Sequence, residues 1–104
     1  MAHELILTGY VISAEEPLRL GLVNEVVELT ELIPAAEAMA KKIATNAPLA
    51  VKYAIEAVEW GYGTALEEGL FLEASLFGLC CATEDMRDGT RAFIEKRSPK
   101  FQGR

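Results

Sequence analysis

The segment TALEEGLFLEASLFGLCC, residues 64–81, constrains the fold of this chain more than any other. With 3.6 residues per turn, its apolar side chains point in nearly every direction around a helix. They are Leu66, Leu70, Phe71, Leu72, Leu76, Phe77, Leu79, Cys80 and Cys81. A helix that is apolar all round is covered on more than one side. A chain of 104 residues can cover only one of these sides well, so we expect the other side to lie against a partner surface.

Length and composition limit the class of protein. A chain of 104 residues forms at most one domain, and 51% apolar with 25% charged residues is ordinary for a soluble globular protein. Glu73 interrupts the longest apolar run, so no membrane span is expected. The MAHE start lacks the features of a secretion signal, and Cys80 and Cys81 point about 100° apart on a helix. We therefore expect a cytoplasmic protein in which both cysteines are small, reduced core residues.

Charge is distributed unevenly along the chain. The net charge is −6, yet residues 87–104 hold six cations and only two acids, which leaves this tail at +4 and residues 1–86 at −10. The six cations are Arg87, Arg91, Lys96, Arg97, Lys100 and Arg104. Such asymmetry can mark an anion-binding edge. The simpler interpretation is a solvated helix end, where cations suit the negative end of the helix dipole.

The remaining elements are predicted to be helical, with one exception. A short helix is expected before Gly21, and two amphipathic helices are expected over residues 30–46 and 49–60. Residues 22–27, LVNEVV, are rich in β-branched side chains and predict a short strand. A lone strand cannot pair with itself, so this one needs an edge that the chain does not supply.

Two helix starts and one glycine carry local predictions near the C-terminus. Thr64 and Glu67 form a capping box that would open the apolar helix, and Thr83 is expected to cap a last helix. Gly89 falls inside that last helix, where glycine costs about 1 kcal/mol relative to alanine. We therefore expect another helix or a ligand to approach closely at Gly89.

Most catalytic chemistries are not indicated by the residues themselves. His3 is the sole histidine, which removes Ser/His/Asp and Cys/His pairs and most zinc sites, so no metal is expected. The glycines of residues 61–63 follow a helix and not a strand, unlike a phosphate-binding loop. The glutamates fall in first turns or polar stripes, where a solvated helix surface explains them. The residues alone therefore predict a mainly α, soluble module with an interaction surface.

Four motifs, taken together, resemble a known family. They are LTG-x-x-ISAEE, GLVNEVV, NAPLAV and ATED-x-x-x-G-x-x-AF-x-EKR-x-P-x-F-x-GR. In this order and spacing they are similar to the C-terminal part of an enoyl-CoA hydratase of the crotonase superfamily, from about Glu4 to Arg104. The resemblance implies a single helical module with at most one short strand. In it, residues 1–28 would end the core region and residues 29–104 would form the helical subunit-packing region.

The resemblance also implies what such a chain does. In this family of lyases of fatty acid β-oxidation, the C-terminal helices pack subunits into trimers or hexamers and cover the coenzyme A site. By match to the AF-x-EKR motif, Phe93 and Lys96 would bind coenzyme A of a neighbouring subunit. Phe77, in the apolar helix, resembles the aromatic residue that closes the acyl pocket. The substrate would be a trans-2-enoyl-CoA, hydrated to a 3-hydroxyacyl-CoA without any tightly bound cofactor.

The catalytic groups of the family belong to a missing N-terminal core. The two glutamates and the oxyanion hole lie upstream of the first motif, so no glutamate here inherits their role and the chain alone is expected to be inactive.

Several alternatives to this interpretation stay open. An isomerase or dehydratase of the superfamily shares this tail, and a stand-alone helical interaction module without catalytic role would explain the apolar helix. Ordinary packing could explain Phe77 and Phe93, and Lys96 could be a free surface amine. Nucleic-acid binding is not expected, because the chain is acidic overall.

Overall fold

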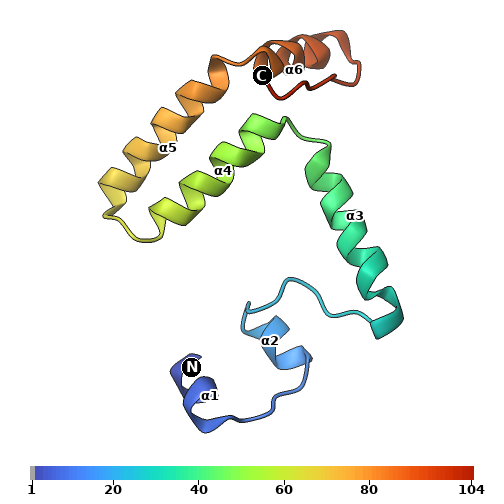
Figure 1. Cartoon of the computed structure of the whole chain (residues 1–104), viewed down its shortest axis with the longest axis vertical. Coiled ribbons are helices and arrows are strands. Elements are labelled where there is room, and N and C mark those ends of the chain that lie inside the picture. The colour runs from blue at the N-terminus through green and yellow to red at the C-terminus, as the bar shows by residue number, and fades with distance from the viewer. Residues whose placement is uncertain (1) are drawn as a thin grey trace. The chain divides into compact units, whose positions relative to one another are not determined.

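The computed structural model describes residues 2–104 and divides the chain into two units, residues 1–37 and 38–104. The first unit holds α1 (Ala2–Thr8), α2 (Glu15–Arg19), the single turn η1 (Leu29–Glu31) and the beginning of α3 (Leu32–Ala44) (Figure 1). Gly21 adopts a left-handed φ of 71° and ends the turn after α2, as expected. None of residues 3–37 is buried, so this unit has no core of its own.

The strand predicted over residues 22–27 is wrong. These residues form a bend and an irregular segment, and no residue from 2 to 104 is in a strand. The physical reason is the lack of a partner strand. An extended segment is stable as a strand only when its backbone groups pair with those of a neighbouring strand. The predicted mainly α fold is confirmed.

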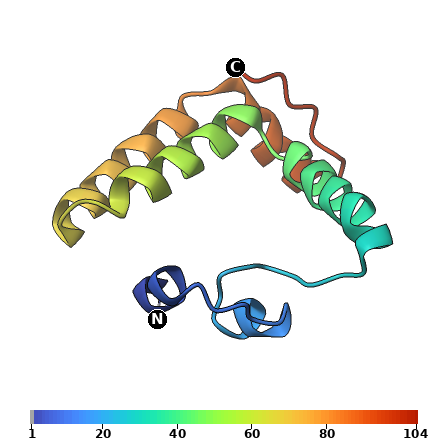
Figure 2. The same cartoon turned by 60° about the horizontal axis from the view of Figure 1, so that its bottom comes forward.

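The second unit is built on an antiparallel helical hairpin of α4 (Pro48–Gly61) and α5 (Leu66–Cys81), which lie side by side (Figures 1 and 2). Pro48 is the first residue of α4, where its missing N–H is tolerated. At the turn, a Cβ on Gly69 would lie only 3.4 Å from Thr64 Oγ1. The predicted capping box is wrong, since Ala65 precedes α5 and makes no side-chain cap. The Thr64 side chain lies against Gly69 instead.

The last helix, α6 (Glu84–Glu95), begins where the sequence predicted. Thr83 Oγ1 accepts a hydrogen bond from the Met86 N–H at 3.1 Å, so the N-cap is confirmed. After α6 the chain turns back along the helix, so that the C-terminus lies near the start of α6 (Figure 1). A Cβ on Gly89 would lie 3.3 Å from Phe101 Cε1. The close approach expected at Gly89 is confirmed, but the chain's own tail makes it and not another helix or a ligand.

Little of the chain is buried by its own fold. Leu76, Ala92 and Asp85 are the only buried residues between 3 and 104. The accessible surface is 8835 Å² for an 11.4 kDa chain. A compact folded protein of this mass exposes roughly 5,800 Å², and two separately compact pieces of the sizes of these units together expose roughly 6,900 Å². The observed surface exceeds the larger of these two values, which does not depend on how the two units are placed. Much of the exposed surface is apolar.

Candidate functional site

An open groove of about 870 Å³ runs along the α4–α5 hairpin. Its lining from α4 is mostly small, with Ala50, Ala54, Ala57 and Gly61, and its lining from α5 is mostly large, with Leu66, Leu70, Leu76 and Phe77. Glu73 is its only charged lining residue. We call this surface the hairpin groove. An apolar surface of this size has the character of a binding or packing site.

Phe77, the residue expected to line an acyl pocket, lies in the wall of the hairpin groove with 69% of its surface exposed. Its surroundings are apolar, and its role stays a prediction. Cys80 also lines the groove and is half-buried, whereas Cys81 is exposed. The prediction that both cysteines are core residues is therefore wrong for Cys81, because α5 buries only one narrow face.

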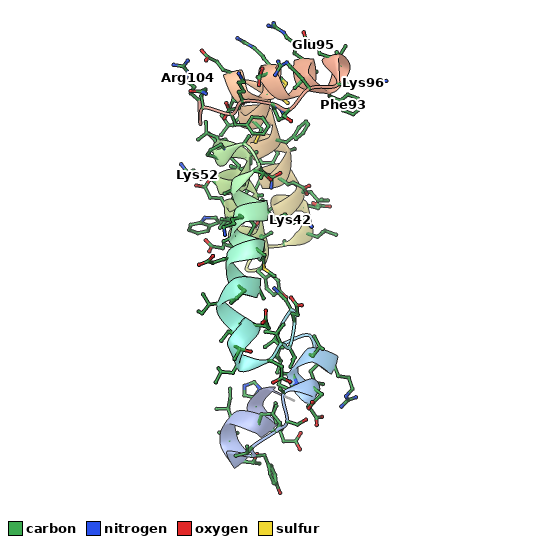
Figure 3. All side chains as sticks on the ribbon, turned by 90° about the vertical axis from the view of Figure 1, so that its right-hand side faces the viewer. Lys42, Lys52, Phe93, Glu95, Lys96 and Arg104 are labelled. Atoms are coloured by element: carbon green, nitrogen blue, oxygen red, sulfur yellow. The ribbon has the colours of Figure 1, made fainter. Side chains whose placement is uncertain are left out.

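Phe93 and Lys96 lie at the same end of α6, and Arg104 lies at the other (Figure 3). Phe93 is 87% exposed. Lys96 follows the last residue of the helix in a left-handed conformation, with φ 52° and ψ 39°. Its ammonium makes no ion pair with any residue from 2 to 104, whereas Glu95 beside it is bonded to Arg97. An exposed aromatic ring and a cation without an ion pair in the described residues therefore lie at the same end of α6.

A second cluster, at the start of α6, was not foreseen as a cluster. Asp85 is only 2% exposed, and its carboxylate accepts hydrogen bonds from the backbone N–H groups of Gln102 at 2.6 Å and Gly103 at 2.8 Å. The Asp85 N–H in turn donates to the Arg104 carbonyl at 3.0 Å. A Cβ on Gly103 would lie 3.7 Å from Pro48, so the tail also reaches the start of α4. The buried carboxylate thus fixes the end of the chain.

One turn further along α6, Asp88 makes similar contacts. Its carboxylate accepts from the Arg97 guanidinium at 2.6 Å and from the Lys100 N–H at 2.7 Å. The hydrogen bond from Arg97, followed by that from the Lys100 N–H, holds the pKa of Asp88 below its ordinary value. Asp88, and then Glu95, raise the pKa of Arg97, so this ion pair stays charged. We call Asp85, Asp88 and the segment 97–104 that they hold the tail clamp.

The tail clamp changes the interpretation of the basic tail. Arg97 pairs with Asp88 and Glu95, and Arg104 pairs with Glu84 at 3.0 Å. Two of the six cations are therefore paired within the chain, Arg97 after the end of α6 and Arg104 at its start. A solvated C-terminal helix end can explain Arg97, whereas Arg104 lies at the opposite end and is explained by its pairing with Glu84. A signal for the clamp was present in the sequence, since two acids three residues apart in α6 precede a segment with no regular structure of its own.

These surfaces define a helical module whose apolar faces exceed what its own chain covers. Within residues 2–104, no helix has the length and apolar character needed to cross a membrane. All 104 residues match the family model described as Enoyl-CoA hydratase/isomerase. The chain therefore belongs to the enoyl-CoA hydratase/isomerase family, as the resemblance predicted.

Individual relatives show the same likeness and a common difference in length. The short-chain-enoyl-CoA hydratase of Clostridium acetobutylicum is 47% identical over 103 residues, which are 99% of this chain and 39% of that protein. The (E)-benzylidenesuccinyl-CoA hydratase of Thauera aromatica is 44% identical over 99% of this chain and 40% of its own length. A crystal structure of enoyl-CoA hydratase from Bacillus anthracis superposes with a TM-score of 0.94 at 42% identity, over 99% of this chain and 40% of that one. The chain thus spans about two fifths of these relatives.

Proposed function

We propose that this chain is the subunit-packing and coenzyme A-site-covering C-terminal part of an enoyl-CoA hydratase. The observation that carries the proposal is the exposed apolar surface, because the chain exposes 8835 Å² where its two units, each compact, would expose roughly 6,900 Å². The span of about two fifths of its relatives supports the same conclusion. The missing N-terminal core and neighbouring copies, as a trimer or hexamer, would cover this surface. As one module, residues 1–28 would end the core region and residues 29–104 would do the packing.

The chain alone is inactive in this proposal. Addition of water across the double bond of an enoyl-CoA thioester needs positioned acid and base groups and donors for the developing oxyanion. The hairpin groove carries a single carboxylate, Glu73, and no second acid lines it. The family resemblance assigns the catalytic groups to the preceding core, so the assembled enzyme would hydrate trans-2-enoyl-CoA in the cytoplasm as part of fatty acid β-oxidation.

The exposed pair at the end of α6 supports a role in coenzyme A binding. Lys96 offers an unpaired ammonium for the nucleotide phosphates of a neighbour's coenzyme A, and Phe93 offers an exposed ring for its pantetheine or adenine. Phe77, in the apolar wall of the hairpin groove, would line the acyl pocket. The coenzyme A thioester is the substrate, and no tightly bound cofactor is proposed.

The acyl group is not decided by this part of the protein. Relatives of similar identity carry names that specify different acyl groups, short-chain in one case and (E)-benzylidenesuccinyl in another. An isomerase or dehydratase of the superfamily fits equally well. A stand-alone interaction module is the second candidate, since the hairpin groove alone would favour self-association without any ligand.

The experiment joins the chain to the part that it is proposed to lack. The 104-residue chain is assayed for crotonyl-CoA hydration alone, then after co-expression with the N-terminal three fifths of the Clostridium acetobutylicum relative. We expect no turnover by the chain alone, and association with recovered turnover in the mixture. Turnover by the chain alone would contradict the proposal that the catalytic groups lie in the N-terminal core. A chain that self-associates yet never binds the N-terminal part would favour the stand-alone module.

A further inference from the structure

The end of α6 holds a lysine in a backbone conformation that favours glycine. Lys96 is the only non-glycine residue with positive φ between residues 2 and 104. The Lys96 N–H donates to the Phe93 carbonyl at 3.3 Å and the Arg97 N–H to the Ala92 carbonyl at 3.0 Å, which together form a Schellman motif. A side chain at the left-handed position of this motif is disfavoured by contact between its Cβ and the backbone. Such a conformation persists when its surroundings determine it.

The tail clamp supplies those surroundings. The chain beyond Lys96 is fixed at three backbone N–H groups, those of Lys100, Gln102 and Gly103, by two carboxylates one turn apart on α6. Hydrogen bonds to an ionised acceptor are stronger than neutral ones, and Asp85 is shielded from water. Phe101, between the fixed positions, packs on Gly89. The segment that follows Lys96 therefore has one path back along α6.

We propose that Asp85 and Asp88 are positioning residues for the coenzyme A-binding end of α6. By holding the tail they keep Lys96 in its left-handed conformation, and so keep its side chain at the same end of α6 as the Phe93 ring. The proposal rests on the proposed role of Lys96 and deepens it. With the tail released, nothing offsets the disfavoured conformation of Lys96, the end of α6 unwinds, and binding must order the ammonium again.

Whether loss of a carboxylate weakens or strengthens coenzyme A binding distinguishes positioning from simple electrostatics. Coenzyme A carries several phosphate charges, and this chain has a net charge of −6. Replacing a carboxylate by an amide removes one negative charge, so Coulomb's law alone predicts tighter binding of the anion. If the carboxylates position Lys96, the same replacement weakens coenzyme A binding. Asp85→Asn and Asp88→Asn are nearly isosteric changes and test the two explanations directly.

The test uses the 104-residue chain, with coenzyme A as the probe at low ionic strength. Affinity is measured by titration, and amide hydrogen exchange reports the tail. We expect Lys96→Ala to weaken binding about fivefold, the upper range for an exposed ion contact. We expect Asp85→Asn and Asp88→Asn each to weaken binding about two- to threefold and to speed exchange at the amides they hold. The amide has one acceptor oxygen where the carboxylate uses two, so one hydrogen bond is lost and the other becomes neutral. Amides of α4 serve as the internal control.

A second variant pair tests the lysine conformation itself. Glycine needs no support at a left-handed position, so Lys96→Gly added to Asp85→Asn is expected to restore protection of the Arg97 N–H without restoring affinity. Lys96→Ala added to Asp85→Asn is the matched control and should restore neither. If the Asp85→Asn variant does not fold, the same test uses Asp88→Asn. The Asp88 carboxylate lies nearer the surface, so its replacement is better tolerated.

Each outcome decides one of the two proposals. Unchanged binding by Lys96→Ala would remove Lys96 from the coenzyme A site, whatever the clamp does. Weaker binding by Lys96→Ala, with equal or tighter binding by both aspartate variants, would overturn the clamp as a positioning device. Slow exchange at Gln102 and Gly103 in the Asp85→Asn variant would overturn it as well, since Asp85 would then not be what holds the tail.

Discussion

The α4–α5 hairpin and α6 with its tail are neighbours in sequence, yet they are stabilised in opposite ways. The hairpin has an open apolar groove, and Leu76 is the one buried side chain of α5. The α6 region buries Asp85 and Ala92, and in the described part of the chain no buried polar side-chain atom lacks a partner. Hydrogen bonds fix α6 and its tail within the chain, although Phe93 and Ile94 stay exposed, whereas the hairpin relies on apolar contacts and has an open apolar groove. The difference indicates which region needs another surface.

The largest effect is expected at the single buried contact of the hairpin. Leu76→Ala should lower the free energy of unfolding by about 2–5 kcal/mol, because it removes a buried side chain and leaves a cavity. Urea unfolding followed by circular dichroism measures the change. Leu29→Ala is the matched control, since Leu29 is exposed and should change stability by less than about 0.5 kcal/mol. Equal effects of the two substitutions would show that Leu76 is not central to the hairpin.

A negative charge placed in the hairpin groove should weaken self-association and leave the tail of α6 unaffected. Phe77→Asp is expected to weaken self-association by about 3 kcal/mol, because it removes a large apolar side chain from a covered surface. Protection of the Gln102 and Gly103 amides should not change. Phe93→Asp, at a ring on α6 that is 87% exposed against 69% for Phe77, is the control and should leave self-association unchanged. If both substitutions weaken association equally, the distinction between the regions fails.

Acid should release the part of the tail that Asp88 holds. The pKa of Asp88 in the folded chain lies below its ordinary value of 3.8, so the stabilisation is fully present above 3.8 and is lost as the pH falls through the folded value. We expect the Lys100 amide to stay protected at pH 4 and to lose protection only below pH 3.8. Amide exchange in Asp88→Asn provides the baseline. Loss of protection already above pH 4, absent from that variant, would contradict the lowered pKa.

The smallest effect is expected at Gly89. Alanine gains about 1 kcal/mol over glycine within a helix, but its Cβ would press on Phe101 at 3.3 Å. We expect the two terms nearly to cancel, so that Gly89→Ala changes stability by less than about 0.5 kcal/mol. In a Phe101→Ala background the same change should stabilise by the full amount, about 1 kcal/mol. A double-mutant cycle measures this coupling, and additive effects would mean that Phe101 does not pack on Gly89.

Local signals in the sequence predicted most helices. Hydrophobic periodicity, Pro48 and the Thr83 cap located α4, α5 and α6, because helices depend on contacts within a few residues. The strand at residues 22–27 was mispredicted for the opposite reason. Composition favours an extended backbone there, but a strand exists only with a partner strand.

The tail clamp could be predicted only in part. Gly89 indicated a close approach, yet the partner was Phe101, twelve residues later, which no short-range pattern specifies. Asp85 gave no sign of burial, because its partners are backbone N–H groups, and every residue except proline has one. Phe93 and Lys96 were singled out by the family motif and Phe77 by its resemblance to the family's acyl-pocket aromatic, and their roles stay predictions.

Sedimentation of the 104-residue chain at tens of micromolar tests the central claim most directly. The claim is that the hairpin groove and its exposed neighbours need a covering surface. We predict a self-associated species of defined size that dissociates on dilution and is weakened in Phe77→Asp. A folded, stable monomer at that concentration, with the groove in contact with water, would contradict the account.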